Sequence, residues 1–421
     1  MRISLGYEAR PQFAPFHLRR QRWACLVAHR RAGKTVACVM DLIDAALRCD
    51  KQDARFAYVA PTYTQAKDVA WLYLKRFTAP LPGVEQRESD LSVILHNGAR
   101  IRLYGADNYD RLRGLFFDGV VMDEYGDMDP RAWPEVIRPA LSDRQGWGVF
   151  IGTPKGSNHF REVWDAAEGD EAWFRAMLKA SETGLLPPAE LADIRKSLTE
   201  DQYAQEMECS FDAAVIGAYY AGELHRLDEA KQVARVPWEP KVPVHTAWDL
   251  GIGDQTAIWC FQKVGDEIRV IDFVRNSGVH LGWYVNELRA RPYTWGTDLL
   301  PHDAEPKRLQ TGESVQETLR GLGRPNSLIV PMHNVYDGIN AVRMLLPRCW
   351  FDAEKCRDGL SALRQYRREW DEKRKVFKER PLHDWCSDPA DAFRYLAMGL
   401  SLIPDANSWG KPLKYSNRGI V

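Results

Sequence analysis

Two patterns of apolar and polar positions divide the chain. In the first half, short apolar runs alternate with segments of helical periodicity, as in ACLVAH followed by KTVACVMDLIDAAL and RFAYVAP followed by TQAKDVAWLYLKRF. This alternation predicts an α/β domain with a parallel-type sheet. The segment SVILHNGARIRLYG instead predicts a β-hairpin that turns at Asn97-Gly98. Two more strand candidates, GVVMD and WGVFIG, flank the helical segment DPRAWPEVIRPALSD.

The pattern changes near Val244. Three consecutive strand candidates, VHTAWDLGI, QTAIWCFQKVG and EIRVIDFVRNSG, predict a meander, and alternating helices and strands follow it. The second half is therefore predicted to be an α/β domain with a mixed sheet. A chain of 421 residues is long enough for two cores. The predicted organisation is a first α/β domain at 1–180, a helical subdomain and linker at 181–240, a second α/β domain at 241–404 and a flexible tail at 405–421.

Composition places few global limits on function. With 57 basic and 58 acidic residues the net charge is −1, so no overall positive field indicates nucleic acid. Two local segments are basic: residues 1–35 (the N-terminal basic segment), with eight basic residues and one acid, and 364–380 (the C-terminal basic segment), with eight and four. Such runs form either solvated faces or phosphate-binding surfaces.

Compartment signals favour the cytoplasm. The sequence contains no uninterrupted apolar stretch of membrane-spanning length, and its start, MRISLGYEARPQF, lacks the apolar core of a signal peptide. The eight cysteines form no C-x-x-C pair. We expect reduced, mostly buried thiols in a soluble protein that does not enter a membrane.

A candidate phosphate-binding loop, AHRRAGKT, follows a predicted buried strand and opens a predicted helix. In a Walker A loop of this kind, backbone N–H groups around Gly33 hold the phosphates of ATP, Lys34 reaches the β and γ phosphates, and Thr35 binds Mg²⁺. Ala28 stands where the motif has its first glycine. The motif alone is therefore a weak match, and a chance G-K-T in a loop is the alternative.

Two further strand ends strengthen the prediction. The apolar run DGVVMDE ends in Asp123 and Glu124, the arrangement of a Walker B strand. There Asp123 would anchor Mg²⁺, and Glu124 would orient and deprotonate the attacking water. We expect the two motifs, in this order, on successive strands of one alternating pattern. A third strand ends at Thr153, whose hydroxyl would sense the γ-phosphate; an ordinary β-turn is the alternative.

Other polar side chains near the loop are candidates for nucleotide contacts. Arg30 and Arg31 lie inside the loop and could touch phosphate in cis. Arg113 precedes the Walker B strand, from which it could project to the nucleotide of a neighbouring subunit, although a surface salt bridge is the alternative for any one arginine. Gln12, upstream of the loop, could read adenine through a bidentate amide contact.

Acidic residues of the second half match the needs of two-metal phosphodiester cleavage, in which several carboxylates hold two Mg²⁺ or Mn²⁺ ions. Asp249 ends the first predicted strand, Asp303 follows the fourth, and Asp391 lies on the first turn of a late helix with Asp388 three residues before it. This is the layout of ribonuclease-H-like nucleases. Individually each could be a turn residue or a helix cap, and Asp388 before proline is a natural N-cap.

Taken together, the motifs HRRAGKT, VVMDEYG, FIGTPKG, AWDLGIGDQTAIW, PHDAE and SDPADAFRYLA resemble, in order and approximate spacing, those of the large terminase subunits of tailed bacteriophages. The resemblance covers roughly residues 10 to 400. The resemblance assigns Lys34 and Thr35 to the Walker A motif, and Asp123 and Glu124 to the Walker B motif. It assigns Thr153 to the coupling motif. It assigns the nuclease role to Asp249, Asp303 and Asp391. Many relatives have histidine where this chain has Asp388, so its role as a fourth ligand stays open.

The resemblance implies a viral DNA-packaging motor. Such a subunit hydrolyses ATP with Mg²⁺ to move double-stranded DNA into a procapsid, and it cuts concatemeric DNA with Mg²⁺ or Mn²⁺. Its implied partners are DNA, a small terminase subunit, the portal protein and further copies of itself in a ring, with a monomer as the alternative in free solution. The implied location is the cytoplasm of the infected bacterium, transiently at the portal.

Three other interpretations remain open on the residues alone. A helicase-like translocase with an inactive second domain would hydrolyse ATP but not cleave DNA. A transposase-type nuclease with an accessory ATPase domain would make defined strand joints. A structural capsid or portal-docking protein would leave both the phosphate-binding and the acidic constellations without a role.

Overall fold

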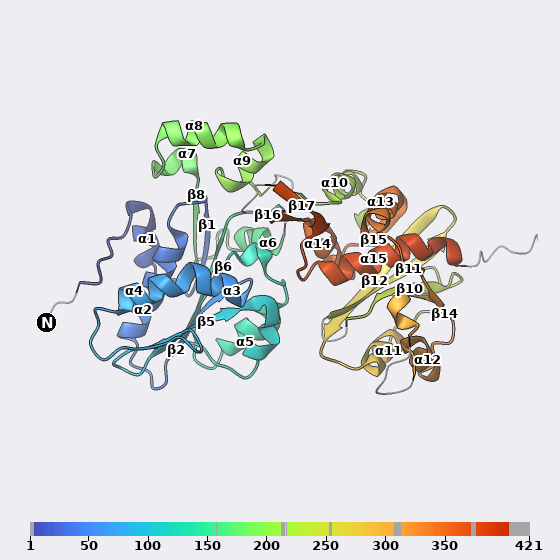
Figure 1. The fold of residues 1–421 in the computed structure, drawn as a ribbon, viewed down its shortest axis with the longest axis horizontal. Helices are drawn as coiled ribbons and strands as arrows, with labels where there is room; N and C mark the ends of the chain where they lie inside the picture. Colours follow the sequence, from blue (N-terminus) through green and yellow to red (C-terminus); the bar gives the residue numbers. More distant parts are fainter. Residues whose placement is uncertain are drawn as a thin grey trace, which may run out of the picture. The chain divides into compact units, whose positions relative to one another are not determined.

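The computed structural model describes residues 4–156, 158–211, 215, 217–251, 255–306, 313–371 and 376–403, without the side chains of 370–376. The chain folds into two compact units, residues 1–218 and 219–421, which are drawn in Figure 1. The predicted flexible tail at 405–421 lies outside the described residues.

Within its described residues, the first unit is built on an eight-stranded sheet with the order β3-β4-β5-β2-β6-β7-β1-β8. The strands are β1 (Trp23–Ala28), β2 (Arg55–Ala60), β3 (Glu85–Arg87), β4 (Ser92–Ile94), β5 (Arg100–Gly105), β6 (Gly119–Asp123), β7 (Trp147–Gly152) and β8 (Trp173–Leu178). The six strands from β5 to β8 in this order are parallel, and β3 and β4 add an antiparallel edge. The predicted parallel-type sheet is confirmed, and its edge makes it mixed.

Both faces of this sheet are covered by helical segments. The α-helices of the unit are α1 (Ala14–His17), α2 (Lys34–Arg48), α3 (Tyr63–Ala66), α4 (Leu72–Thr78), α5 (Arg138–Ala140), α6 (His159–Ala166), α7 (Ala180–Thr183), α8 (Pro188–Ser197) and α9 (Glu200–Glu206). Leu26 packs with α2 on one face, whereas its neighbour Val27 packs with the π-helical segment η5 (Ala132–Ile137) on the other. Since alternate side chains enter two different cores, each strand is a continuous apolar run in the sequence.

The predicted hairpin is confirmed by the antiparallel pairing of β4 with β5. Leu95 N donates to Ala99 O, and Gly98 N donates to Leu95 O, both at 2.9 Å. Gly98 has a φ of +82°, the left-handed conformation that a turn of this length needs at its last position. The side chain of Asn97 donates to Ala46 O near the end of α2 (2.9 Å), so this hydrogen bond also joins the turn to the helix.

The second unit contains, among its described residues, a seven-stranded sheet with the order β14-β13-β10-β11-β12-β15-β9. Its strands are β9 (Val233–Ala234), β10 (Val244–Asp249), β11 (Gln255–Val264), β12 (Glu267–Ser277), β13 (Trp295–Leu300), β14 (Ser327–Ile329) and β15 (Cys349–Asp352). The meander β10-β11-β12 is antiparallel, and β13 runs parallel to β10 on its other side. The predicted mixed sheet is confirmed, and its strand order is that of ribonuclease-H-like folds.

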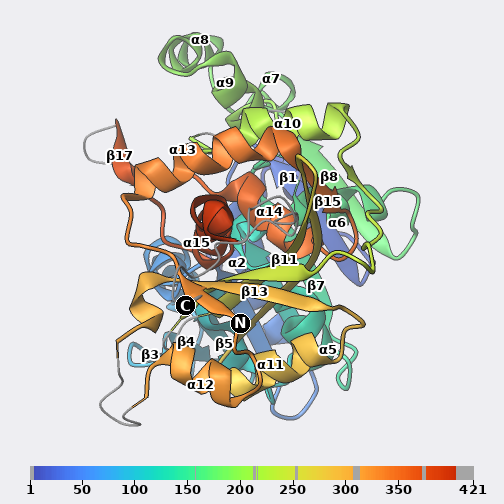
Figure 2. The ribbon, with the colours of Figure 1, turned by 90° about the vertical axis from the view of Figure 1, so that its right-hand side faces the viewer.

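Helices cover both faces of this second sheet as well. They are α10 (Ala221–Glu229), α11 (Leu281–Arg289), α12 (Val315–Gly321), α13 (Val335–Leu345), α14 (Arg357–Gln365) and α15 (Ser387–Gly399), and a separate hairpin is formed by β16 (Arg368–Asp371) and β17 (Val376–Pro381). Figure 2 shows α13, α14 and α15 on one side of the sheet and α11 and α12 on the other. Helix α15 packs against β10, β11 and β13, which places its acidic residues beside the ends of those strands.

The structure bears on two expectations, the absence of a membrane-spanning segment and the burial of the cysteines. None of the helices in the described part of the chain is long and apolar enough to cross a membrane. All eight cysteines are free thiols, and all except Cys49 are buried.

His245 provides a test of how this second sheet depends on pH. Its ring is 7% exposed, and Nδ1 accepts a hydrogen bond from Thr297 N (3.0 Å). Burial lowers the pKa of His245 to about 4, so the folded protein holds this imidazole neutral. The unfolded chain, with a histidine pKa near 6.5, takes up the proton first as pH falls. The stability that the neutral ring contributes is therefore present above about pH 6.5 and is lost between about pH 6.5 and 4.

We expect this effect to amount to as much as about 3 kcal/mol. In His245→Gln, a side-chain acceptor for Thr297 N remains but does not titrate, so the variant should lose less stability on acidification than the wild type. The measurement is the free energy of unfolding in urea at about pH 7 and about pH 4.5. Equal losses in both proteins would assign the pH dependence to other groups.

Candidate functional site

The candidate phosphate-binding loop joins the end of β1 to the start of α2. Strand β1 ends at Ala28, and α2 begins at Lys34 with Gly33 as its N-cap residue, at a φ of +101°. Glycine adopts this left-handed conformation at little cost, which accounts for it at position 33. Ala28 belongs to the extended strand. Its methyl group therefore needs no unusual backbone conformation, and the departure from the motif's first glycine does not distort the loop.

Lys34 is turned back into the loop and is 8% exposed. Its Nζ donates to Ala28 O (2.9 Å) and Thr153 Oγ1 (3.1 Å), and it lies 3.7 Å from Glu124 Oε1. The structure thus brings residues from the ends of β1, β6 and β7 together at one edge of the sheet. The expectation that the two Walker motifs lie on successive strands is wrong, because β2 to β5 come between β1 and β6 along the chain. In the sheet, β7 lies between β1 and β6. This intervening strand is what places Thr153 beside Lys34.

Asp123 ends β6 in a buried environment, with 5% of its surface exposed. Tyr58, on the adjacent strand β2, donates its hydroxyl to Asp123 Oδ2 and also interacts with the side chain of Thr35. Burial, and then the charge of Glu124, raise the pKa of Asp123 to about 6, while Tyr58 and Lys34 act in the opposite direction. A bound cation would favour the ionised carboxylate, so the donor set of Thr35 and Asp123 fits Mg²⁺.

Glu124 follows β6 in a left-handed backbone conformation, with φ +48° and ψ +47°. Such a conformation is strained for a residue other than glycine and is concentrated at functional sites. The side chain is about one third exposed (35%), and Oε2 accepts a long hydrogen bond from Thr153 N (3.4 Å). The turn therefore aims a solvent-accessible carboxylate at the space beside Lys34.

The other predicted nucleotide contacts surround this loop. Gln12 donates through Nε2 to Thr183 O (2.7 Å), and its buried Oε1 has no hydrogen-bond partner among the described residues. A bidentate contact with adenine would thus require the first bond to break. Arg30 pairs with Glu206 (2.9 Å), although its side chain is mostly exposed. Arg31 is exposed, with a φ of +67°.

Arg113 lies outside this cluster in the described structure. It follows the 3₁₀-helix η3 (Ala106–Leu112) and is about half exposed. Its guanidinium pairs with Asp110 (2.7 Å) and Glu135 (3.2 Å). These are exposed contacts of the kind that contribute little stability, so they leave the predicted role in a neighbouring subunit untested.

The predicted nuclease acids converge in the second unit. Asp249 ends β10, and Asp303 lies in the 3₁₀-helix η6 (His302–Ala304) just after the parallel strand β13. Asp388 and Asp391 lie on α15. Burial, and then the charges of Asp391, Asp388 and Asp303 in that order, raise the pKa of Asp249 well above its usual value. Each of the other three carboxylates is therefore close enough to Asp249 to repel its charge.

Two details of helix α15 differ from the prediction. The helix begins at Ser387 with Cys386 at its N-cap, so Asp388 is the second helical residue and does not cap the helix. Asp391 is the fifth helical residue and lies on the second turn, not the first. The helix starts earlier than expected because proline is readily accommodated within the first turn. The three-residue spacing still puts both aspartates on one helix face.

The donor chemistry of this cluster fits a hard divalent cation, since its members are carboxylates at which a positive charge would relieve repulsion. In the described part of the chain, however, no three histidine, cysteine or acidic side chains are already arranged to hold a metal ion. The carboxylates thus lie in one region of the unit but are not preorganised as a metal-binding site.

Sequence reasoning missed several side chains at the two sites. Arg10 donates to Ala32 O (2.7 Å) and lies against Gly33, where it supports the phosphate-binding loop. Tyr58 contacts Asp123, as described above. In the second unit, Arg394 Nη2 lies 2.6 Å from Asp391 Oδ1. The only sequence signals were a tyrosine within an apolar strand and an arginine three residues after a candidate ligand.

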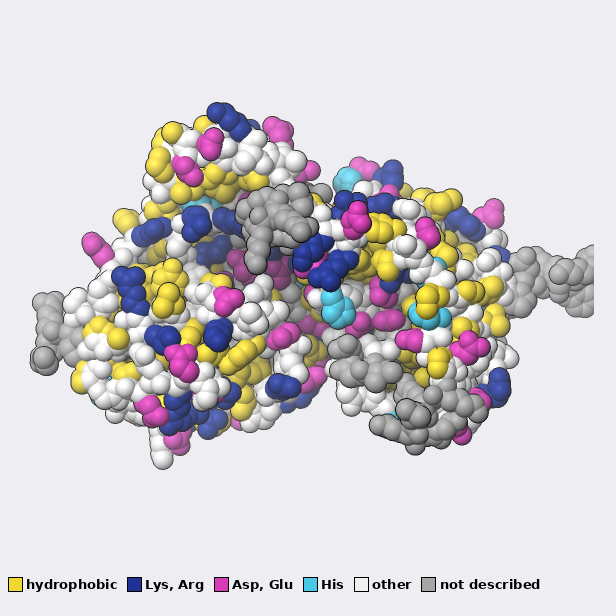
Figure 3. All heavy atoms as spheres, in the orientation of Figure 1, with side chains coloured by type: hydrophobic (Ala, Val, Ile, Leu, Met, Phe, Trp, Pro, Cys, Tyr) yellow, Lys and Arg dark blue, Asp and Glu magenta, His cyan; other side chains and the backbone are white. Residues whose placement is uncertain are grey.

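Several basic side chains of the C-terminal basic segment are paired with acidic side chains, so fewer of its positive charges are free than its composition indicates. Arg364 forms a two-bond pair with Asp228 (2.6 and 2.8 Å), and Lys378 and Arg380 both pair with Glu369 (2.5 and 2.6 Å). Figure 3 shows basic and acidic side chains interspersed over the visible face. Any DNA contact by this segment would therefore have to compete with these ion pairs.

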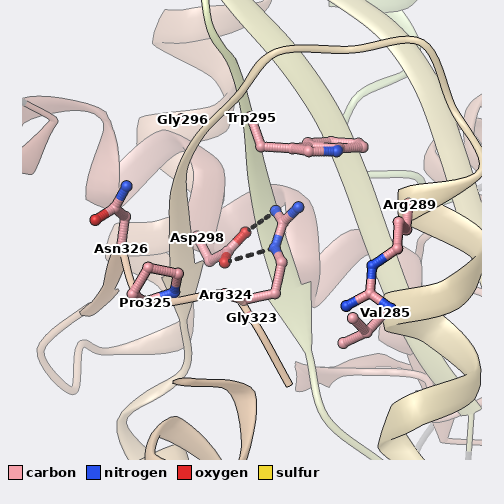
Figure 4. A pocket seen from close by; sticks show the side chains of 9 residues that line it. All are labelled: Val285, Arg289, Trp295, Gly296, Asp298, Gly323, Arg324, Pro325 and Asn326. Carbon is pink, nitrogen blue, oxygen red and sulfur yellow. Dashed lines mark hydrogen bonds and ion pairs between the residues drawn. The ribbon is translucent and has the colours of Figure 1, made fainter. Parts of the chain in front are cut away.

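A cavity of about 180 Å³ lies elsewhere in the second unit, between α11, the start of β13 and residues 323–326. Figure 4 shows the Arg324 guanidinium paired with Asp298 and covered by the ring of Trp295, 4.5 Å from the ring centre. Asp303 follows the opposite end of β13, so this cavity is not at the acidic cluster. Its buried charges are paired with each other, which is typical of structural packing.

The fold and these constellations define a two-unit α/β protein, a P-loop unit followed by a ribonuclease-H-like unit. No family model matches the chain. It is 22% identical over 395 residues, 89% of this chain and 86% of the relative, to the large terminase subunit of Escherichia phage T5. It is 29% identical over 164 residues to the large terminase subunit of Thermus phage G20c, of which the match spans only 33%. Over most of its length the chain is therefore similar to a large terminase subunit of a tailed phage.

The crystal structure of the HK97 bacteriophage large terminase is a more distant likeness. It is 11% identical, and the match covers 91% of this chain and 91% of that protein with a TM-score of 0.44. This similarity is too low to add to the assignment.

Proposed function

We propose that this chain is the motor and cutting subunit of a phage DNA-packaging machine. It would hydrolyse ATP to move double-stranded DNA into a procapsid and cleave concatemeric DNA. The observation that carries the proposal is that one chain holds two separate constellations, a phosphate loop with its acidic partners and a cluster of four carboxylates. Each lies at the carboxyl edge of parallel strands, where α/β sheets commonly present their functional groups.

In the ATPase half, Lys34 would leave its contacts with Ala28 and Thr153 and bind the β and γ phosphates. Thr35 and Asp123 would hold Mg²⁺, which neutralises charge on the phosphates. Glu124 would take the proton of the attacking water. Because Thr153 now shares a hydrogen bond with Lys34, its hydroxyl would register whether the lysine is engaged by a γ-phosphate.

At the periphery, the backbone N–H of Gly33 would bind phosphate at the start of α2. Arg30 and Arg31 would approach the phosphates in cis once the ion pair of Arg30 with Glu206 opens. The unpartnered Oε1 of Gln12 would accept a hydrogen bond from the adenine amino group. This contact uses only one of the two bonds expected from the sequence, because Nε2 is engaged with Thr183.

In the nuclease half, Asp249, Asp303 and Asp391 would be the metal ligands, with Asp388 as a fourth. Two Mg²⁺ or Mn²⁺ ions would stabilise both the attacking and the leaving oxygen. The repulsion that the other three acids exert on Asp249 supports the assignment, because a bound divalent cation would relieve it.

The wider proposal concerns organisation and partners. We propose a P-loop domain at 1–180, a helical subdomain and linker at 181–240 and a nuclease domain at 241–404. The partners would be double-stranded DNA, a small terminase subunit, a portal protein and further copies of the chain in a ring. The site of action would be the cytoplasm of the infected bacterium, transiently at the portal.

Two assays on one purified preparation test the function. We expect ATP hydrolysis that requires Mg²⁺, and linearisation and degradation of plasmid DNA with Mn²⁺. ATP hydrolysis without cleavage under any metal would favour the helicase-like alternative, and defined strand joints would favour the transposase-type one. Absence of both activities from a folded protein would contradict the proposal.

Arg113 gives a prediction about assembly. If it completes the ATP site of a neighbouring subunit, Arg113→Ala should reduce hydrolysis by about 10³-fold or more. Mixing this variant with Lys34→Ala subunits should then restore part of the rate, because some interfaces combine an intact loop with an intact arginine. The measurement is steady-state ATPase of the mixture, with mixed assembly verified by cross-linking. No recovery in verified mixed rings would exclude a role in trans.

A further inference from the structure

The nuclease cluster contains a positive charge that the proposed chemistry does not use. Arg394, on α15, is 92% buried, with 8% of its side chain exposed. Its Nη2 lies 2.6 Å from Asp391 Oδ1, and Tyr366 donates to the same oxygen at 3.5 Å. Among the described residues no donor reaches Asp391 Oδ2. One carboxylate oxygen of this proposed ligand is therefore occupied by the protein itself.

Stability alone does not explain this arginine. Its Nε is buried and has no hydrogen-bond partner in the described part of the chain, although a buried arginine usually satisfies all its donors. Isolated buried ion pairs commonly contribute little net stability, because desolvation offsets the attraction. An arginine that is both buried and incompletely bonded indicates a role for its charge.

The fold also makes room for this side chain. Gly338 is the fourth residue of α13, and glycine is an unfavourable residue inside a helix. A methyl group there would lie 2.8 Å from His333 Nε2 and 3.1 Å from Arg394 Cδ. The glycine thus lets α13 approach α15 with the arginine between them, so the position of Arg394 is built by two helices.

We propose that Arg394 is a resident counter-ion that holds Asp391 by Oδ1 and lowers the affinity of the carboxylate cluster for divalent cations when no DNA is bound. This inference rests on the proposed nuclease function and specifies its regulation. A guanidinium beside the carboxylates repels an incoming divalent cation and competes with it for Asp391. A nuclease joined to a DNA pump would thereby hold its metals weakly until the substrate's phosphates add negative charge.

The test measures Mn²⁺ binding to the full chain by electron paramagnetic resonance, without DNA or nucleotide. Arg394→Gln and Arg394→Met remove the charge, and we expect both to bind Mn²⁺ about tenfold more tightly than the wild type. Arg394→Lys keeps the charge and should stay near the wild-type affinity. A merely structural arginine would give the opposite result, since a disturbed site binds metal more weakly.

Controls assign the signal. Arg291→Gln removes an arginine that pairs with Asp272 (2.9 Å) in the same unit, and it should leave the affinity unchanged. Asp249→Asn should remove the ions that belong to the cluster. Cooperative thermal unfolding identifies the neutral Arg394 variants that are folded. If such a variant binds Mn²⁺ with unchanged or lower affinity, the inference is overturned. Failure of both the wild type and the neutral Arg394 variants to bind Mn²⁺ through Asp249 would instead contradict the proposed nuclease function.

Discussion

Replacing Glu124 with glutamine is expected to reduce ATP turnover by about 10²- to 10⁴-fold while ATP binding remains. The reason is chemical, because the amide keeps the shape of the side chain but cannot accept the proton of the attacking water. Lys34→Ala should differ in kind. It removes the amine that reaches the phosphates, so its main effect should be weaker nucleotide binding.

The measurements are the steady-state ATPase rate and the affinity for a fluorescent ATP analogue. Glu168→Gln is the matched control, because Glu168 is an exposed acid of the same unit that pairs with Arg175 (3.2 Å). It should behave as the wild type. Near-normal turnover by the Glu124→Gln protein would remove this residue from the catalytic step.

Changing Asp249 to asparagine is expected to lower plasmid cleavage by more than about 100-fold, since loss of groups that merely orient metal ligands already costs 10- to 100-fold. Asp249 ends β10 at the centre of the carboxylate cluster, and each of the other three acids acts on it. The ATPase rate should change less than about twofold, because the two sites belong to different folded units.

The assay follows supercoiled plasmid with Mn²⁺, beside an ATPase measurement on the same protein. Asp266→Asn, an exposed aspartate in the turn between β11 and β12, is the control and should cleave normally. Cleavage by the Asp249→Asn protein at the wild-type rate would sink the assignment. Asp303→Asn and Asp391→Asn should reproduce the loss.

The reach of the sequence follows from how local each signal is. Gly33 and Lys34 were predictable because a strand, a glycine and a helix start follow one another along the chain. Asp123 and Asp249 were predictable because each ends an apolar strand, and parallel topology brings such ends to one edge. Hydrophobic periodicity therefore predicted both sheets and the residues at their carboxyl ends.

Contacts between distant segments were beyond this reasoning. Tyr58 meets Asp123 only because β2 pairs with β6, and the insertion of β7 between β1 and β6 has no local signature. Arg394 is close in sequence to Asp391, but its burial depends on a glycine in α13. Such features depend on packing, which periodicity does not encode.

At Glu124, the requirements of folding stability and of ATP turnover conflict, because the residue has a left-handed backbone conformation. Glycine would relax that conformation, by about 1–3 kcal/mol on the usual cost of such strain. It would also delete the carboxylate proposed to activate water. Selection for thermal stability alone should therefore favour glycine at residue 124 and yield folded proteins without ATPase activity. Selection for DNA packaging should instead retain glutamate in its left-handed conformation.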